Sequence, residues 1–127
     1  MPYEVTWRQE KRILFQRFYG DIDLEMSAAL SERMWRLLDE GVAPVHLIAD
    51  TSEMGKFPTN IAKLHHIASF LSHPSLGWSV LIGASSRVNF MVTAVGHMTS
   101  LRMVHRTTMI DAIEFLRTQD STLIAER

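Results

Sequence analysis

The sequence predicts an α/β domain with a mixed β-sheet, in which an N-terminal hairpin precedes alternating helices and strands. Two strand-like runs open the chain, and helix-like and strand-like patterns then alternate to its end. Helix-capping residues also stand where the helices have to begin. We expect about five strands and four helices in a single domain over residues 1–127, because this length suffices for one ordinary core but not for two.

Two runs that suit β-structure predict the hairpin. In residues 3–8 apolar and polar side chains alternate, which is the period of a half-buried strand. A charged turn over residues 9–12 leads into residues 13–19, a run rich in aromatic side chains. Gly20 and Asp21 end this run, so the first two strands are expected to pair antiparallel.

The first long helix is predicted between Asp23, its N-cap, and Glu40. Apolar residues recur there at three- and four-residue steps, which gives the helix one core-facing side. Gly41 is expected to end it in the left-handed conformation, and Pro44 prevents its continuation.

The rest of the chain alternates between strands and helices. We expect a central strand over residues 45–50, a loop over 51–58, a helix capped by Thr59 or Asn60 and ended by His73-Pro74, a strand over 78–82, a helix from about 88 to 99, a short strand over 102–106 and a last helix capped by Thr107 or Thr108. Strands joined through helices should be parallel with right-handed crossovers.

This order of elements resembles a STAS domain, the module of anti-sigma-factor antagonists, over nearly the whole chain. The most specific piece is His46–Ser52, which is similar to the central strand of that family and its terminal aspartate. The family carries an Asp-Ser pair at the start of the following helix, where a partner kinase phosphorylates the serine. Here the matching residues 57–60 read Phe-Pro-Thr-Asn, so the chain is similar to the uncharacterised STAS-like branch that lacks the phosphorylatable pair. A cap role is the favoured reading of Thr59.

Composition excludes several classes of function. A hydrophobic fraction of 46% and a charged fraction of 21% are globular values. With 13 basic and 14 acidic residues the net charge is -1, so no broad positive field favours nucleic acid. The chain has no cysteine, its first residues do not resemble a signal peptide, and no apolar run approaches the roughly 18 residues that span a bilayer. We therefore expect a cytoplasmic domain without a transmembrane segment.

Neither a metal site nor an active site is predicted. Of the six histidines, His65 and His66 are adjacent on a helix and point about 100° apart, and the other four belong to separate elements. Hydrogen-bonded or surface roles are expected for them, with no metal and no cofactor. No nucleophile elbow and no paired carboxylates stand out, so we expect no enzyme.

A small polar turn, residues 83–87, offers the best ligand site. It joins the carboxyl end of a parallel strand to a helix, where open α/β sheets often bind ligands. Hydroxyls, helix amides and an arginine could hold an anion there, although an ordinary helix cap explains the same residues. Strand ends brought to the same edge would complete a rim that consists of Asp50, Ser52, Thr59, Ser85, Ser86 and Arg87.

The third predicted helix has an unusually wide apolar surface. Its apolar side chains cover an arc of about 200°, twice what one core face requires. The surplus indicates deep burial, a wall for an apolar ligand, or a self-association surface formed by Phe90, Met91, Ala94 and Met98.

Together these features predict a non-catalytic binding or regulatory module that acts through protein–protein interaction as a homodimer. Two alternatives stay open. One is a small protein that binds lipid or another apolar ligand, and the other is a switch that responds to phosphorylation or to an anion.

Overall fold

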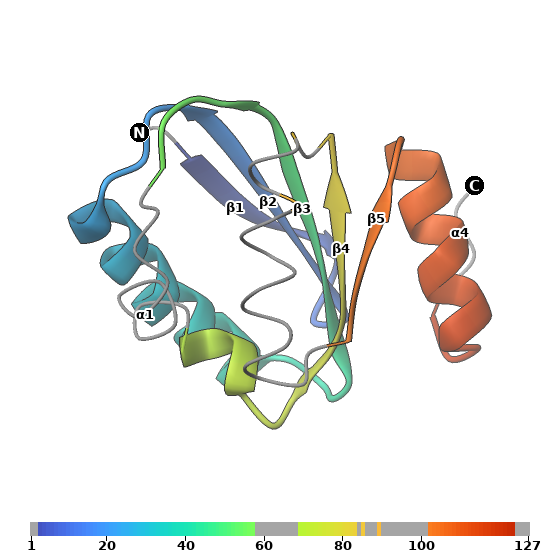
Figure 1. Cartoon of the computed structure of the whole chain (residues 1–127). Helices are drawn as coiled ribbons and strands as arrows, with labels where there is room; N and C mark the ends of the chain where they lie inside the picture. Colours follow the sequence, from blue (N-terminus) through green and yellow to red (C-terminus); the bar gives the residue numbers. More distant parts are fainter. Residues whose placement is uncertain (1–2, 58–68, 84, 86–88, 90–101, 124–127) are drawn as a thin grey trace.

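The computed structural model describes residues 3–57, 69–83, 85, 89 and 102–123. They form a five-stranded sheet in the order β1-β2-β3-β4-β5, with helices on both faces (Figure 1). In chain order the elements are β1 (Tyr3–Gln9), β2 (Ile13–Gly20), α1 (Leu24–Glu40), β3 (Val45–Met54), the 3-10 turn η1 (Ser69–Ser72), β4 (Leu76–Ile82), β5 (Met103–Arg106) and α4 (Met109–Gln119).

The sheet is mixed, as predicted. β1 and β2 pair antiparallel, whereas β2, β3, β4 and β5 run parallel to their neighbours. A tight turn joins the first two strands, with Lys11 at a φ of 62° and the Arg12 amide donating to the Gln9 carbonyl over 3.0 Å. A bulge lies between Trp7 and Gln9, so the regular β1–β2 register covers the earlier part of β1.

The start of α1 confirms the predicted cap, but its end does not. Asp23 accepts a hydrogen bond of 2.8 Å from the Met26 amide through its side chain. Gly41, however, is extended at φ -77° and ψ 173°, so the predicted left-handed conformation is wrong. A Cβ there would lie 2.4 Å from a methyl carbon of Val45 and 3.1 Å from the Lys11 carbonyl oxygen. The glycine is required because the chain passes closely over the hairpin turn on its way into β3.

β3 continues four residues beyond the predicted end at Asp50. Residues 51–54 were expected to be a loop because they are polar, yet Glu53 and Met54 pair with Tyr19 and Gly20 of β2. β4 ends at Ile82, opposite Asp50. The last four residues of β3 therefore pair with a strand on one side only, and the polar residues Ser52 and Glu53 are exposed although they belong to a strand.

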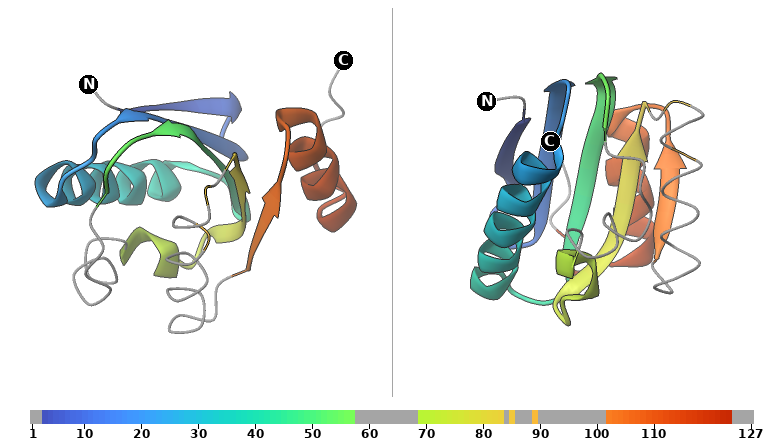
Figure 2. Two further views of the ribbon diagram at one scale, coloured as in Figure 1. Left: turned by 45° about the horizontal axis from the view of Figure 1, so that its top comes forward. Right: turned by 60° about the vertical axis from the view of Figure 1, so that its left-hand side comes forward.

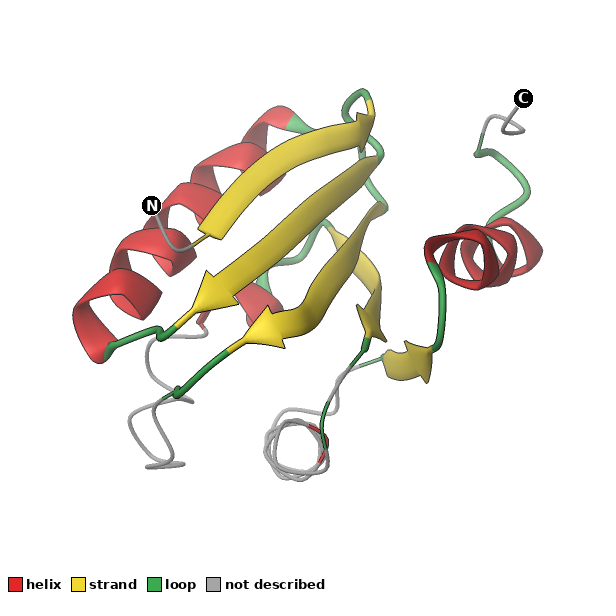
Figure 3. Cartoon of the chain, turned by 90° about the horizontal axis from the view of Figure 1, so that it is seen from above, coloured by secondary structure: helices red, strands yellow, loops and turns green. Residues whose placement is uncertain are grey.

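The core has two layers, one on each face of the sheet (Figure 2). α1 and η1 cover one face, where Leu14, Leu47 and Leu81 of the strands meet Leu30, Met34 and Leu38 of the helix. α4 covers part of the other face, where its Ala112, Ile113 and Leu116 pack on Ile13, Ile48 and Val80. Seen from above, α4 lies at the β5 end of the sheet and α1 lies beneath the β1–β2 end (Figure 3).

Two of the four predicted helices lie in the described ranges. α4 begins at its predicted cap, because the Thr108 hydroxyl accepts from the Asp111 amide over 3.1 Å. The second and third predicted helices fall largely on residues 58–68, 86–88 and 90–101, which lie outside the described part of the chain. The expected end of the second is the turn η1. None of the helices within the described ranges has the length and apolar character to cross a bilayer.

Candidate functional site

The carboxyl ends of β3 and β4 form the part of the predicted rim that the structure describes. Asp50 is half-buried, and its Oδ1 accepts from both the amide and the hydroxyl of Ser52, over 3.0 and 2.6 Å. The neighbouring Thr51 is buried and donates through its hydroxyl to the Ile82 carbonyl over 3.2 Å. The strand alternation thus turns Thr51 inward to join β3 to β4, and leaves Ser52 exposed at the surface.

Gly83, the first residue after β4, lies against Ser52 of the rim. Its φ is +67°, and a Cβ at this position would lie 2.6 Å from the Ser52 Cβ and 3.1 Å from the Ser52 Cα. Position 83 therefore requires glycine for two reasons: its backbone is left-handed, and the ends of β3 and β4 approach each other closely there. The sequence predicts a small polar turn after β4, and the close approach of Gly83 to Ser52 is the physical reason for one of its small residues.

Ser85 follows as an exposed residue, and its carbonyl accepts from the Asn89 amide over 2.9 Å, the i to i+4 bond that opens a helix. The other three predicted rim residues, Thr59, Ser86 and Arg87, lie outside the described residues.

An ion pair and a tyrosine–glutamate hydrogen bond flank this rim, and no sequence spacing indicates them. Arg17 donates to Glu53 over 2.9 Å, and its guanidinium lies 4.9 Å from the centre of the Tyr19 ring. The hydrogen bond and charge of Glu53 raise the pKa of Arg17. Tyr19 donates to Glu4 of β1, and this bond raises the pKa of the phenol. The β2–β3 register, which places Tyr19 opposite Glu53, brings Arg17 and Tyr19 to Glu53, and the β1–β2 pairing brings Glu4 to Tyr19.

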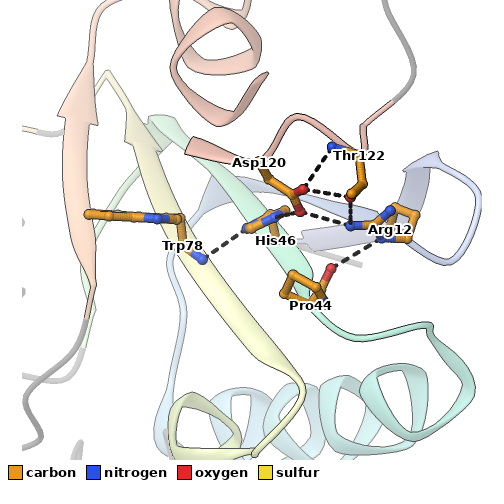
Figure 4. Close-up of polar contacts among 6 residues, drawn as sticks. All are labelled: Arg12, Pro44, His46, Trp78, Asp120 and Thr122. Atoms are coloured by element: carbon orange, nitrogen blue, oxygen red, sulfur yellow. Dashed lines mark hydrogen bonds and ion pairs between the residues drawn. The ribbon is translucent and has the colours of Figure 1, made fainter. Parts of the chain in front are cut away.

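A second polar cluster lies at the other end of the parallel strands, where β3 begins (Figure 4). Asp120, the C-cap of α4, accepts from Arg12 over 2.8 Å and from the Thr122 amide over 3.0 Å. His46 lies 2.9 Å from the same carboxylate and is only 2% exposed. Arg12 also donates to the Pro44 carbonyl over 3.2 Å. The cluster joins the end of α4 to the starts of β2 and β3.

The contacts of His46 define its protonation. The Trp78 amide donates to Nδ1 over 3.0 Å, so Nδ1 carries no proton and Nε2 donates to Asp120. Burial lowers the pKa of His46 and outweighs the opposing effect of Asp120. Burial alone would raise the pKa of Asp120, but hydrogen bonds from Thr122 and His46 together with the charge of Arg12 hold it well below its usual range. The cluster is thus a neutral imidazole between an amide and a carboxylate.

Both ring nitrogens of His46 are hydrogen-bonded, and the cluster connects the end of α4 to the sheet. A Cβ on Gly77 would lie 2.6 Å from the ring, so the start of β4 passes closely over the imidazole on that side. His73 is also hydrogen-bonded: its Nε2 lies 2.7 Å from Asp39, and its Nδ1 accepts from the Ser75 amide. Within the described ranges no three histidines or carboxylates gather as metal ligands, while His65, His66 and His97 fall outside them.

Comparison with known sequences adds nothing to this picture. No protein-family model matches the chain, and no curated protein sequence matches it.

Solved structures, in contrast, match the fold over almost the whole chain. The anti-sigma factor antagonist SpoIIAA in its unphosphorylated form has a TM-score of 0.63 at 12% identity, covering 97% of this chain and 99% of that one. An uncharacterised DUF3478 protein with a SpoIIAA-like fold, from Shewanella loihica PV-4, has a TM-score of 0.65 at 13% identity over 90% and 91%. The Bacillus cell fate determinant SpoIIAA in its phosphorylated form has a TM-score of 0.58 at 15% identity over 91% and 99%. At these identities the similarity establishes the fold.

Proposed function

We propose that this chain, whose fold is STAS-like, is a non-catalytic regulatory module that binds a protein partner in the cytoplasm. The observation that carries the proposal is the structural match to an anti-sigma factor antagonist, which covers 97% of this chain and 99% of that one. A shared fold does not transfer a partner, so the proposal also depends on a surface suited to recognition.

The rim at the carboxyl ends of β3 and β4 is the proposed partner-binding surface. Ser52 is exposed and oriented by Asp50, and Ser85 is exposed at a helix start. The sequence adds Thr59, Ser86 and Arg87 to the same strand ends. Hydroxyls, a carboxylate and a guanidinium recognise polar groups of a partner.

We propose further that the module works without phosphorylation at the position used by the STAS family. Residues 57–60 lack the Asp-Ser pair, and Thr59 is the nearest hydroxyl. A kinase that phosphorylates a STAS domain should therefore leave this protein unmodified, as mass spectrometry would report. Phosphate on Thr59 would favour the phosphorylation-responsive switch instead.

The proposed module is a homodimer. On sequence grounds Phe90, Met91, Ala94 and Met98 offer an apolar self-association surface, and all four lie outside the described residues. The same surplus of apolar side chains would suit a lipid-binding protein, which is the main competing function.

Native mass spectrometry of the protein isolated gently from its host separates these functions. We expect the mass of the unmodified chain, as a dimer and in complex with a second polypeptide. A co-purified lipid would contradict the proposal in favour of the apolar-ligand protein, and an added phosphate would contradict it in favour of the switch. A protein recovered with no polypeptide partner under any growth condition would also count against it.

A further inference from the structure

β1 is an edge strand of the sheet (Figure 3). It pairs with β2 on one side, and among the described residues no strand pairs with its other side. An edge strand offers a row of backbone donors and acceptors, and proteins commonly protect such an edge with charges, prolines or bulges. In β1 the bulge lies at the Arg8 end, and Tyr3–Trp7 keep an uninterrupted register with β2.

The charges of β1 are arranged so that the strand is complementary to itself. Its exposed residues are Glu4, Thr6 and Arg8, which alternate with the buried or half-buried Tyr3, Val5, Trp7 and Gln9. If two copies pair antiparallel about Thr6, Glu4 of each copy faces Arg8 of the other. Thr6 then faces Thr6 on the same surface, and Val5 faces Trp7 on the α1 side. Opposite charges, paired threonines and an aromatic residue beside a β-branched one are all favourable cross-strand pairs.

Other two-fold registers are worse. Centring the pair on Glu4 or on Arg8 places like charges directly opposite one another, and centring it on Trp7 places Glu4 opposite Glu10. Centring on Val5 avoids repulsion but pairs no charges and leaves Arg8 outside the overlap. The register about Thr6 alone pairs Glu4 with Arg8 in both directions, with Val5, Thr6 and Trp7 in the regular part of the strand and Arg8 at its bulge.

We propose that the outer edge of β1 binds β1 of a second copy in this register, which joins two five-stranded sheets into one continuous sheet. The contact is isologous, so it closes as a two-fold dimer rather than growing into a fibre. The pairing adds a contact across the interface to those that Glu4 makes with Tyr19 in its own chain. This inference rests on the proposed homodimeric state and places the interface at β1 instead of the third predicted helix.

A single cysteine at the symmetry axis tests the register. The protein contains no cysteine, so Thr6→Cys supplies the only thiol. Residues directly opposite in an antiparallel pair have Cα atoms about 4.5 to 5.5 Å apart, which is within disulfide range. We expect Thr6→Cys to form a covalent dimer almost completely under mild oxidation. Thr118→Cys, an exposed control on α4, should stay monomeric on a denaturing gel.

A charge exchange tests the paired residues. In light scattering, Glu4→Arg and Arg8→Glu should each weaken the dimer by about tenfold in dissociation constant, because each creates two like-charge pairs. The double variant restores opposite charges in exchanged positions and should recover the affinity of the unmodified protein to within about threefold. Thermal unfolding of each variant checks that the monomer remains folded.

The outcomes separate the β1 interface from the wider proposal. A dimer that survives both single variants but dissociates in Met91→Glu would overturn the β1 interface and leave the homodimer in place. A protein that stays monomeric at high micromolar concentration would overturn both, and yet it would leave binding of a polypeptide partner at the rim unaffected. Failure of the double variant to recover affinity would also contradict the proposed register.

Discussion

His46 and Asp120 lie 74 residues apart in sequence, and their side chains join β3 to the end of α4 through a hydrogen bond of 2.9 Å. The carboxylate also accepts from Arg12, whose side chain is 15% exposed. One acidic group at the end of α4 therefore contacts both the start of β2 and the start of β3. Because His46 is almost fully buried, loss of its partner would leave a buried donor without an acceptor.

We therefore expect Asp120→Ala to lower the free energy of unfolding by about 2 to 4 kcal/mol, the range for removing one member of a buried charged network. Urea unfolding measures this loss. Glu114→Ala, at an exposed position of the same helix, is the control and should change stability by less than about 0.5 kcal/mol. Equal effects of the two substitutions would show that the cluster does not stabilise the fold.

Stability should fall as the pH drops below about 6.5. The pKa of His46 is lowered in the folded state, chiefly by burial, whereas an unfolded histidine titrates near 6.5. Below that pH the unfolded chain binds a proton that the folded protein does not, so unfolding becomes more favourable by up to about 1.4 kcal/mol per pH unit. The pKa of Asp120 is also lowered, so a further loss should follow below about pH 4.

Denaturant titrations at pH 7.5, 6 and 5 measure this dependence. His46→Gln should be less stable at pH 7.5 but should lose less stability between pH 7.5 and 5 than the unmodified protein. Identical pH dependence in the two proteins would contradict the assignment to His46.

Gly83 and Gly20 form a matched pair for testing the rim. Both have positive φ, at +67° and +68°, but a Cβ on Gly20 meets nothing within 4 Å. Gly20→Ala should therefore lower the free energy of unfolding by only about 1 kcal/mol, because alanine is strained in the left-handed conformation. Gly83→Ala should cost about 1 to 2 kcal/mol more, because the new Cβ meets Ser52.

The double variant Gly83→Ala with Ser52→Gly removes the contact between the new Cβ and the Ser52 Cβ. It should recover part of the stability that Gly83→Ala loses. Thermal and urea unfolding of the variants decide the matter. Equal losses for Gly20→Ala and Gly83→Ala would contradict the close approach of the two strand ends.

If the rim holds an anion or a polar head group, Arg87→Ala should weaken its binding by about 1.5 to 3 kcal/mol, the scale of a hydrogen bond to a charged group. Folding stability should hardly change. Chemical-shift mapping with phosphate, nucleotides and lipid head groups measures this, and amide shifts confined to other surfaces would show that the rim is not the ligand site.

Much of the fold could be predicted because its signals are local. Alternation in β1, the caps Asp23 and Thr108, and the parallel order of the later strands all follow from short stretches of sequence. The length of β3 could not, because the polar residues Ser52 and Glu53 form a strand only through their pairing with β2. The conformation of Gly41 depends likewise on a close contact with a distant side chain.

The candidate site was predictable to the extent that strand ends determine it. Asp50 and Ser52 lie at the predicted edge, and the contact of Ser52 with Gly83 links them to the turn after β4. The charged pair of Arg17 and Glu53, in contrast, depends on the β2–β3 register, and no sequence spacing indicates it. A histidine inside an apolar strand does indicate a buried hydrogen bond at His46, but its partner Asp120 is too distant in sequence to identify.

The most direct test of the proposed function places a photo-crosslinking amino acid at Ser52 and, as a control, at Glu32 on the exposed side of α1. After irradiation in the host, the Ser52 variant should form one discrete adduct with a second polypeptide, which mass spectrometry identifies. The same purified polypeptide should then bind the unmodified protein and bind Ser52→Arg at least about tenfold more weakly, because a bulky charge at the centre of an interface disrupts its packing. An adduct from Glu32 but none from Ser52, or equal affinity for the two proteins, would contradict the assignment of the rim as the partner-binding surface.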